Sequence, residues 1–321
     1  MIKNLSPLEQ RRLFEDRGLI FPHGNKYNLK NAHKIQEIGY YKLKEFAYPF
    51  STCKNNKLRY HDLTFSMLLA RYYQDKNLRI HILHAIEDIE VNLNSNIADI
   101  LGNYGAFAYL RFNYWTNRKI SKFKIIKKQK KFKKHLKRNI YRMRSYTKLR
   151  DLYLKNNLND QNFPSVWLMV NTLTLGTTVH LFIDMSKHNK IELAKRYKCR
   201  PSKLIPWLKC LNFIRNLCAH NSDLIDIRLI SNLSTPKLFK NCIFMIPNKK
   251  GKLMYSNSLA NIIFVIKYLM CSVNPKYKFD NIYKSIHNII DGNIKISHNL
   301  GFKNTECAKY IKCKPNRLGF K

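Results

Sequence analysis

Apolar residues recur at helical spacing along most of the 321-residue chain. The clearest stripe steps by three or four positions, which places its members on one face of an α-helix: Ile82, Ile86, Ile89, Leu93, Ile97 and Ile100. Two further stripes have the same period: Leu204, Leu208, Leu211, Arg215 and Cys218, and then Leu259, Ile262 or Ile263, Ile266, Leu269 and Met270. Strand-type alternation is scarce, and only 10 residues are glycine. The pattern therefore predicts an all-α, multi-helix protein.

One segment differs from the rest in its balance of charge. Residues 118–155 contain 17 lysines and arginines but a single acid, Asp151. Apolar residues step through the segment by four, four and three positions: Phe132, Leu136, Ile140 and Met143. We predict a basic amphipathic helix that binds the phosphates of RNA, with these cations in contact: Lys127, Lys128, Lys130, Lys131, Lys133, Lys134, Lys137, Arg138, Arg142 and Arg144. The alternative is an ordinary solvated helix that packs through its apolar stripe.

Charge over the whole chain favours a polyanionic partner. The sequence has 59 lysines and arginines against 20 acids, a formal net charge of +39. Part of this excess reflects a general richness in lysine, asparagine and isoleucine, but the shortage of acids points to nucleic acid or an anionic surface. A hydrophobic content of 45% is that of a folded chain rather than a disordered one.

Nothing in the sequence favours an extracellular or membrane-spanning protein. The eight cysteines form no CxxC pair and no zinc-finger spacing, so we expect reduced core residues in a cytoplasmic protein. The first ten residues contain no apolar signal core. The longest apolar run, 259–273, is interrupted by Asn261 and Lys267 and is predicted to be a buried helix.

An arginine followed five positions later by a histidine is the main candidate for chemistry. Arg215 and His220 lie on a predicted helix, where Asn216 shares a face with His220. The pairs Arg17 with His23 and Arg79 with His84 have similar spacing. The first crosses a Pro-Gly turn, and both members of the second can face solvent. Spacing alone also allows a structural role, with an arginine that pairs with an acid and a histidine that ends a helix.

A metal site is the chemical alternative. His81, His84, Glu87 and Asp88 have the spacing of one helix face and could hold a divalent ion. No second carboxylate cluster completes a two-metal nuclease. We therefore favour ordinary ion pairs, for example with Arg79, and expect neither a metal nor another cofactor.

Several short motifs together resemble the abortive-infection (Abi-like, AbiD/AbiF) family, whose members carry a HEPN ribonuclease motif. They are spread over about residues 1–290: Leu5-Ser6 to Arg17-Gly18-Leu19, Ile38 to Leu43 with Tyr48-Pro49-Phe50, Asp75 to Arg79, Ile86 to Glu90, Pro164 to Trp167 with Leu175-Gly176-Thr177, and Trp207 to His220. The chain departs from the family pattern at Asn171, where glutamate is frequent, and after His220, where Asn221 to Asp226 replace a second histidine and its flank.

The resemblance implies a HEPN-like helical bundle and RNA cleavage without a metal. In that interpretation His220 exchanges the proton, Arg215 stabilises the charged phosphate and Asn216 orients one of them. A homodimer with a composite site is expected, because one histidine cannot easily act as base and acid in one step. The resemblance further implies an effector of anti-phage abortive infection, controlled by or bound to an RNA.

We divide the chain into an N-terminal helical part (1–116), a basic helical segment (117–160), a motif-bearing helical part (161–290) and a basic C-terminal tail (291–321). Two other functions stay open. One is a non-catalytic RNA-binding protein in which Arg215 and His220 are structural. The other, less favoured because we expect no membrane partner, is a basic protein that docks on an anionic membrane.

Overall fold

The computed structural model describes residues 4–22, 24–117, 119–146, 150–248 and 250–314. Residues 315–321 of the predicted C-terminal tail lie outside the described residues. The described chain is mostly helical, so the prediction of an all-α fold is confirmed. Its strands form two antiparallel pairs: β1 (Ser51–Lys54) with β2 (Lys57–Tyr60), and β3 (Met245–Pro247) with β4 (Leu253–Tyr255). Short 3-10 helices connect the elements: η1 (Tyr48–Phe50), η2 (Ala108–Leu110), η3 (Phe112–Tyr114), η4 (Arg150–Tyr153), η5 (Lys155–Asn157), η6 (Val170–Thr172), η7 (Lys237–Cys242) and η8 (Thr305–Ile311).

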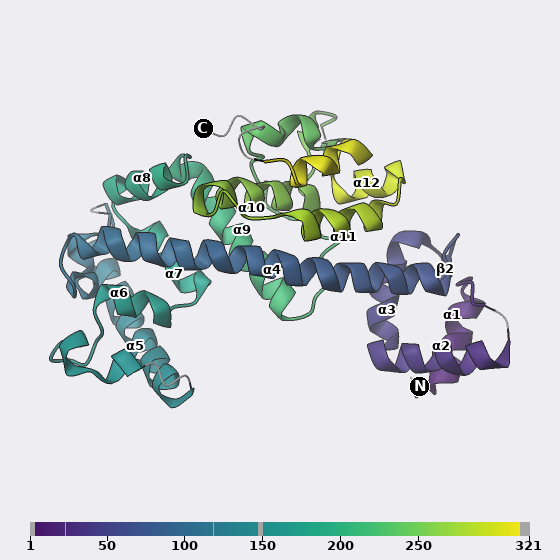
Figure 1. Cartoon of the computed structure of the whole chain (residues 1–321), viewed down its shortest axis with the longest axis horizontal. Coiled ribbons are helices and arrows are strands. Elements are labelled where there is room, and N and C mark those ends of the chain that lie inside the picture. Colours follow the sequence, from purple (N-terminus) through teal and green to yellow (C-terminus); the bar gives the residue numbers. More distant parts are fainter. Residues whose placement is uncertain (1–3, 23, 118, 147–149, 249, 315–321) are drawn as a thin grey trace.

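A single long helix, α4 (Phe65–Gly102), runs across the molecule and contacts α3 and each of the helices from α6 to α11 (Figure 1). Thr64 caps its first turn, because its hydroxyl accepts a hydrogen bond from the N–H of Met67 at 3.2 Å. The predicted stripe from Ile82 to Ile100 is buried throughout. The helix nevertheless begins 17 positions before that stripe, in a stretch where polar residues interrupt the apolar pattern.

An N-terminal lobe lies at one end of α4. It contains α1 (Pro7–Asp16), α2 (Asn25–Ile38), α3 (Tyr40–Ala47) and the β1–β2 hairpin (Figure 1). Asn55 and Asn56 form the hairpin turn with φ of 50° and 59°, as the tight turns of twisted hairpins require. Gly18 has φ of 92°, and a Cβ there would lie 2.8 Å from the carbonyl oxygen of Tyr60. Only glycine allows α1 to end this close to the hairpin.

A second lobe at the other end of α4 contains the basic helix. This helix, α5 (Lys122–Tyr146), buries Phe132, Leu136 and Ile140 and half-buries Met143, so the predicted amphipathic helix is present. It lies below α6 (Val166–Met169) and α7 (Leu175–Asp184) in Figure 1. The apolar stripe holds the helix against the lobe, and the lysines cover its other faces.

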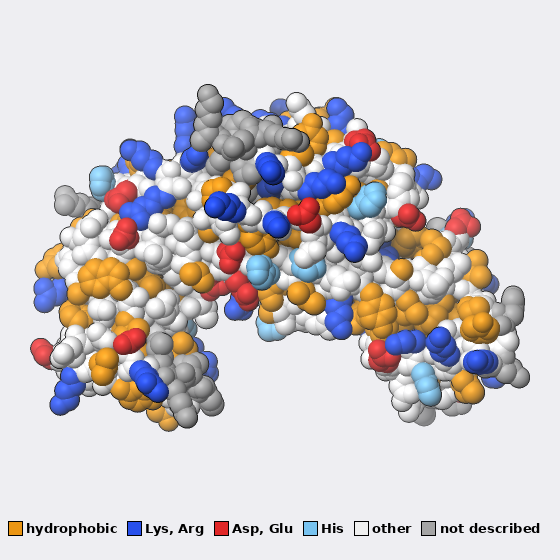
Figure 2. Space-filling model, viewed as in Figure 1, with side chains coloured by type: hydrophobic (Ala, Val, Ile, Leu, Met, Phe, Trp, Pro, Cys, Tyr) orange, Lys and Arg blue, Asp and Glu red, His pale blue; other side chains and the backbone are white. Residues whose placement is uncertain are grey.

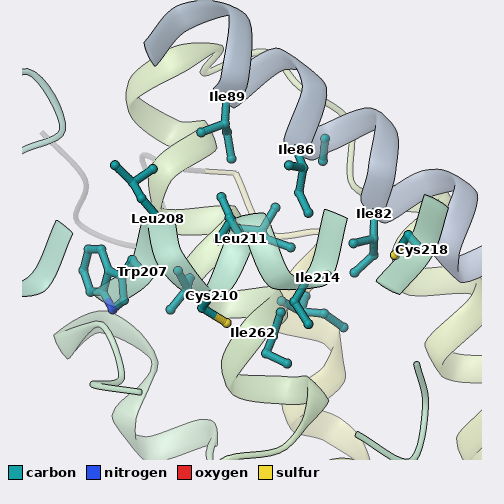
Figure 3. Close-up of a cluster of buried hydrophobic side chains, with 14 of the residues drawn as sticks. Ile82, Ile86, Ile89, Trp207, Leu208, Cys210, Leu211, Ile214, Cys218 and Ile262 are labelled. Carbon is teal, nitrogen blue, oxygen red and sulfur yellow. The ribbon is translucent and has the colours of Figure 1, made fainter. Parts of the chain in front are cut away.

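The main core forms where α4 crosses α9 (Pro201–Ala219) and α10 (Leu259–Val273). Figure 3 shows Ile82, Ile86 and Ile89 of α4 facing Leu208, Leu211 and Ile214 of α9, with Ile262 of α10 below them, on the side away from α4. α10 is buried on almost all sides, as predicted from its apolar run. It lies on the upper side of α4 with α8 (Lys187–Arg196), α11 (Asp280–Ile290) and α12 (Ile294–Leu300) (Figure 1).

The arrangement leaves a hollow on the lower side of α4, between the N-terminal lobe and the α5 lobe (Figure 2). None of the described helices combines the length and the apolar composition needed to cross a bilayer. The expectation of buried cysteines holds for Cys210, Cys218, Cys242, Cys271 and Cys307. It is wrong for Cys53, which is exposed on β1, and only partly right for the half-buried Cys199 and Cys313.

Candidate functional site

The predicted catalytic residues occupy the last turn of α9. Asn216 and His220 are exposed, and Arg215 is half-buried. His220 caps the helix, with φ of −91° and ψ of 13°, and its N–H donates to the carbonyl oxygen of Asn216 at 2.9 Å. In Figure 1, α9 passes α4 so that its end emerges in the hollow. The three residues are therefore near one another on a solvent-accessible helix end.

Arg215 lies at the border between the core and this exposed end. We predicted it on the apolar stripe of its helix, but the structure corrects that placement, because Ile214 continues the buried stripe and Arg215 lies beside it. Its Nε atom is buried and has no hydrogen-bond partner among the described residues. Glu90 on α4 is near. Burial raises the pKa of the Glu90 carboxyl, and the charge of Arg215 opposes that rise.

The loop after His220 is tied to α4 by a buried ion pair. Arg79 Nε donates to Asp75 Oδ2 at 2.7 Å, and both side chains are almost fully buried. The other carboxylate oxygen of Asp75 accepts from the N–H groups of Leu224 and Ile225, each at 3.0 Å. Burial raises the pKa of Asp75, whereas Arg79 and the two amides lower it. Both oxygens of Asp75 thus have hydrogen-bond partners, as the burial of a carboxylate requires, whereas Nη2 of Arg79 is buried without a partner among the described residues.

Asn221 completes this connection directly after the candidate histidine. It adopts the left-handed conformation, with φ of 58°, which asparagine tolerates better than most residues. Its side-chain oxygen accepts a hydrogen bond from Arg79. The departure from the family pattern at this position therefore has a local structural role, because Asn221 turns the chain and fastens it to α4.

A second group of charges lies beside the first. Arg71 on α4 pairs with Asp226 at 2.5 Å. Asp223 has no such partner, and its Oδ1 is buried without a hydrogen bond among the described residues, as is Oδ2 of Asp226. Burial and the neighbouring Asp226 and Asp75 raise the pKa of Asp223 to about 7. The loop after His220 therefore contains one firmly paired carboxylate and one that takes up a proton near neutral pH.

The pair of Arg79 and His84 does not form a comparable site, and His23 of the pair with Arg17 lies outside the described residues. Arg79 was predicted to be able to face solvent with His84, and this is wrong for Arg79, which is buried against Asp75 rather than paired with Glu87 or Asp88. His84 is exposed, and its Nδ1 lies 3.0 Å from the hydroxyl of Tyr277. In the part of the chain that the structure describes, no group of three or more histidine, cysteine, aspartate or glutamate side chains is arranged to hold a metal.

The ten cations assigned to RNA binding divide into two groups on α5. Six are exposed and make no hydrogen bond or ion pair within the described ranges: Lys127, Lys130, Lys131, Lys134, Arg138 and Arg142. Four have partners inside the lobe. Lys128 pairs with Asp184, and Arg144 donates to the carbonyl oxygen of Leu152. The Nζ atoms of Lys133 and Lys137 lie 6.0 and 5.3 Å from the centre of the Phe163 ring. The exposed group is the surface available for phosphates.

These observations describe a class of protein: an α-helical, strongly basic chain with an arginine and a histidine at an exposed helix end. A family model described as Abi-like protein matches residues 33–226, more than half of the chain. The chain therefore belongs to this abortive-infection family, and the matched region includes Arg215, Asn216 and His220. No curated protein and no solved structure matches the sequence.

Sequence reasoning missed the residues that support this helix end. Asp75 and Arg79 are separated by four positions on a predicted helix, which is a signal for an ion pair but not for a contact with residues 221–225. Glu90 belongs to the motif from Ile86 to Glu90, but nothing in its spacing shows that α9 crosses α4 there. Asn171, the other departure from the family pattern, is exposed on η6.

Proposed function

We propose that this Abi-like protein is a metal-independent endoribonuclease that acts as an effector in anti-phage abortive infection. The observation that carries the proposal is the group of Arg215, Asn216 and His220 at the exposed end of α9, whose following loop is hydrogen-bonded to α4. Its family supports the biological role. The charge of +39 supports RNA as the substrate.

The reaction that suits these side chains is internal attack by a ribose 2′-hydroxyl on the adjacent phosphate. A neutral imidazole takes the 2′-hydroxyl proton as the new bond between the 2′-oxygen and phosphorus forms. A protonated imidazole gives a proton to the 5′-oxygen as the bond between phosphorus and the 5′-oxygen breaks. The products are a 2′,3′-cyclic phosphate and a 5′-hydroxyl. Proton transfer by a positioned histidine contributes about 10²- to 10⁴-fold to the rate. Arg215, always charged, stabilises the phosphate oxygens in the transition state.

The chemistry requires two imidazoles in opposite protonation states, and each chain supplies one at this helix end. We propose that two chains form a homodimer in which two α9 ends make one composite site. The end of α9 emerges in the hollow between the lobes (Figures 1 and 2), where a second chain or RNA can approach it. The exposed cations of α5 would bind RNA, either the substrate or a small RNA that controls the toxin.

The test is cleavage of end-labelled single-stranded RNA by purified protein in EDTA. The wild-type protein is expected to cleave and to leave 2′,3′-cyclic phosphate ends, whereas His220→Ala is expected to bind RNA without cleaving it. His188→Ala is the matched control, because His188 has a side chain that is 84% exposed, lies on α8 and should be dispensable. Loss of cleavage in EDTA, or full cleavage by His220→Ala, would contradict the proposal.

A second function is a non-catalytic RNA-binding protein. Two observations favour it: His220 ends α9, where histidine commonly has a structural role, and Arg215 is half-buried near the acid Glu90. This function predicts RNA binding without cleavage by the wild-type protein under all divalent-ion conditions. It also predicts that His220→Ala lowers thermal stability.

A further inference from the structure

The N-terminal lobe contains a cavity of about 540 Å³ between α1 and α3. Its walls include Gln10 and Arg17 from the first helix and the turn after it, and Tyr40, Tyr41 and Lys44 from α3. Its volume lies in the range of small-ligand sites. Leu5 and Leu13 contribute apolar surface to the cavity, and the other side chains that line it are polar or aromatic.

Two cations in this cavity lack carboxylate partners. Arg17 donates from Nη1 to the hydroxyl of Tyr40 at 2.6 Å. The Nζ atom of Lys44 lies 5.8 Å from the centre of the Tyr41 ring and 5.5 Å from that of Tyr48. Neither cation forms an ion pair with any acid in the described ranges, although their neighbours Arg11 and Lys42 do. The cavity therefore has an uncompensated positive charge that an anion can neutralise.

The aromatic side chains offer a surface for stacking. Tyr40 packs on Phe14 with ring centres 4.5 Å apart, and Tyr41 meets Tyr40 edge to face at 5.3 Å. Tyr41 itself is 73% exposed, and Tyr48 is 49% exposed. Tyr40 thus packs against the core and against Tyr41, while Tyr41 presents its ring to solvent. Exposed rings beside unpaired cations are typical of sites that bind single-stranded nucleic acid.

We propose that this cavity binds one nucleotide of a single-stranded RNA, with the base on Tyr41 and the phosphate between Arg17 and Lys44. The proposal rests on the proposed function insofar as that function supplies RNA as the ligand. It adds a contact on the side of the hollow opposite α5, because α3 borders the hollow in Figure 1. An RNA that crosses the hollow would be held by α5 at one side and by this nucleotide site at the other.

The first experiment measures binding of a fluorescent oligouridylate by anisotropy, with every variant made in His220→Ala protein. Tyr41→Ala is expected to weaken binding about tenfold, because it removes one stacked base. Tyr41→Phe keeps the ring and should bind as the parent does. Tyr27→Ala is the matched control, since Tyr27 is a 49%-exposed tyrosine on α2 outside the cavity. Unchanged affinity in Tyr41→Ala would overturn the proposal.

A second experiment separates a nucleotide from a simple anion and is independent of α5. In saturation-transfer NMR, saturation of the protein aromatic protons is expected to transfer to the base protons of uridine monophosphate. This transfer is expected to disappear in Tyr41→Ala. Transfer that persists in Tyr41→Ala, or binding of inorganic phosphate without any transfer to uridine monophosphate, would overturn the nucleotide site. Neither experiment requires cleavage, so a protein without ribonuclease activity can still bind the nucleotide, and an active ribonuclease can lack this site.

Discussion

The carboxylate of Asp75 accepts a hydrogen bond from the N–H of Leu224 at 3.0 Å, although the two residues are 149 positions apart. Asp75 lies in the first half of α4, and Leu224 follows His220 by four residues. One buried acid therefore connects the long helix to the candidate active site. The same carboxylate accepts a hydrogen bond from Arg79, which also donates to the side-chain oxygen of Asn221.

Removing this acid should lower the free energy of unfolding markedly. Asp75→Ala leaves the Arg79 guanidinium buried without its counter-ion and two amides without acceptors, and loss of one partner of a buried pair costs about 3–5 kcal/mol. Urea denaturation at pH 7 measures the change. Glu306→Ala breaks an exposed pair with Lys309 and should leave the unfolding midpoint unchanged. Equal midpoints for the two variants would contradict the role given to Asp75.

Asp223 should make stability depend on pH between about 4 and 7. Its pKa rises from 3.8 to about 7 in the folded protein, because it is buried beside Asp226 and Asp75, with Arg71 and Lys42 opposing them. The folded carboxyl thus binds its proton more tightly than the unfolded one, and its contribution to stability is lost as the pH rises through this window.

Asp223→Asn should therefore be more stable than the wild-type protein at pH 8, by at most about 4 kcal/mol, and no more stable at pH 4. Urea denaturation at a series of pH values gives the difference between the two proteins. Asp160→Asn replaces an exposed aspartate and should show no such pH-dependent difference. A constant difference for Asp223→Asn across the series would mean that the carboxyl does not titrate in this range.

Charge reversal on α5 should weaken RNA binding and reduce its dependence on salt. The variant changes four exposed lysines to glutamate: Lys127, Lys130, Lys131 and Lys134. For a single strand, the slope of log affinity against log salt falls by about 0.7 for each phosphate that the protein no longer neutralises. Binding measured from 50 to 200 mM salt gives this slope. The control reverses four exposed lysines elsewhere: Lys276, Lys278, Lys284 and Lys295. Similar slopes for the two variants would exclude α5 as the phosphate-binding surface.

Mixing wild-type and His220→Ala chains should reveal whether two chains build one site. If both histidines are required, only dimers of two wild-type chains cleave RNA, and an equal mixture after random reassociation retains about a quarter of the activity. Activity is compared with that of the same total amount of wild-type protein. Retention of half the activity would mean that each chain acts independently and would contradict the composite site.

The sequence predicted elements better than the contacts between them. Helical stripes such as Ile82 to Ile100 identified the buried faces, because the period of an amphipathic helix is a local property. The same reasoning placed Phe132, Leu136 and Ile140 on the packed face of α5. It missed the beginning of α4 at Phe65 and the two small hairpins, since short strands and polar helix ends have weak patterns.

The candidate site shows the same division. Arg215, Asn216 and His220 were recognised through a resemblance and their spacing on one helix. The side chains that fix this helix end are distant in sequence, and no local pattern links Asp75 to residue 224. Arg79 illustrates the difficulty. A charged residue on a predicted helix is expected in solvent unless its buried partner is known.

α4 has 38 residues, so its length is about 57 Å. Both lobes and the α9 end are attached to this one rod, and their separation and relative orientation are therefore set by its residue count. Deleting a single residue between Arg79 and Glu90 would shorten the rod by only about 1.5 Å but turn everything beyond it by about 100°. We expect insertions and deletions to be tolerated in the connecting loops and to be incompatible with folding inside this helix.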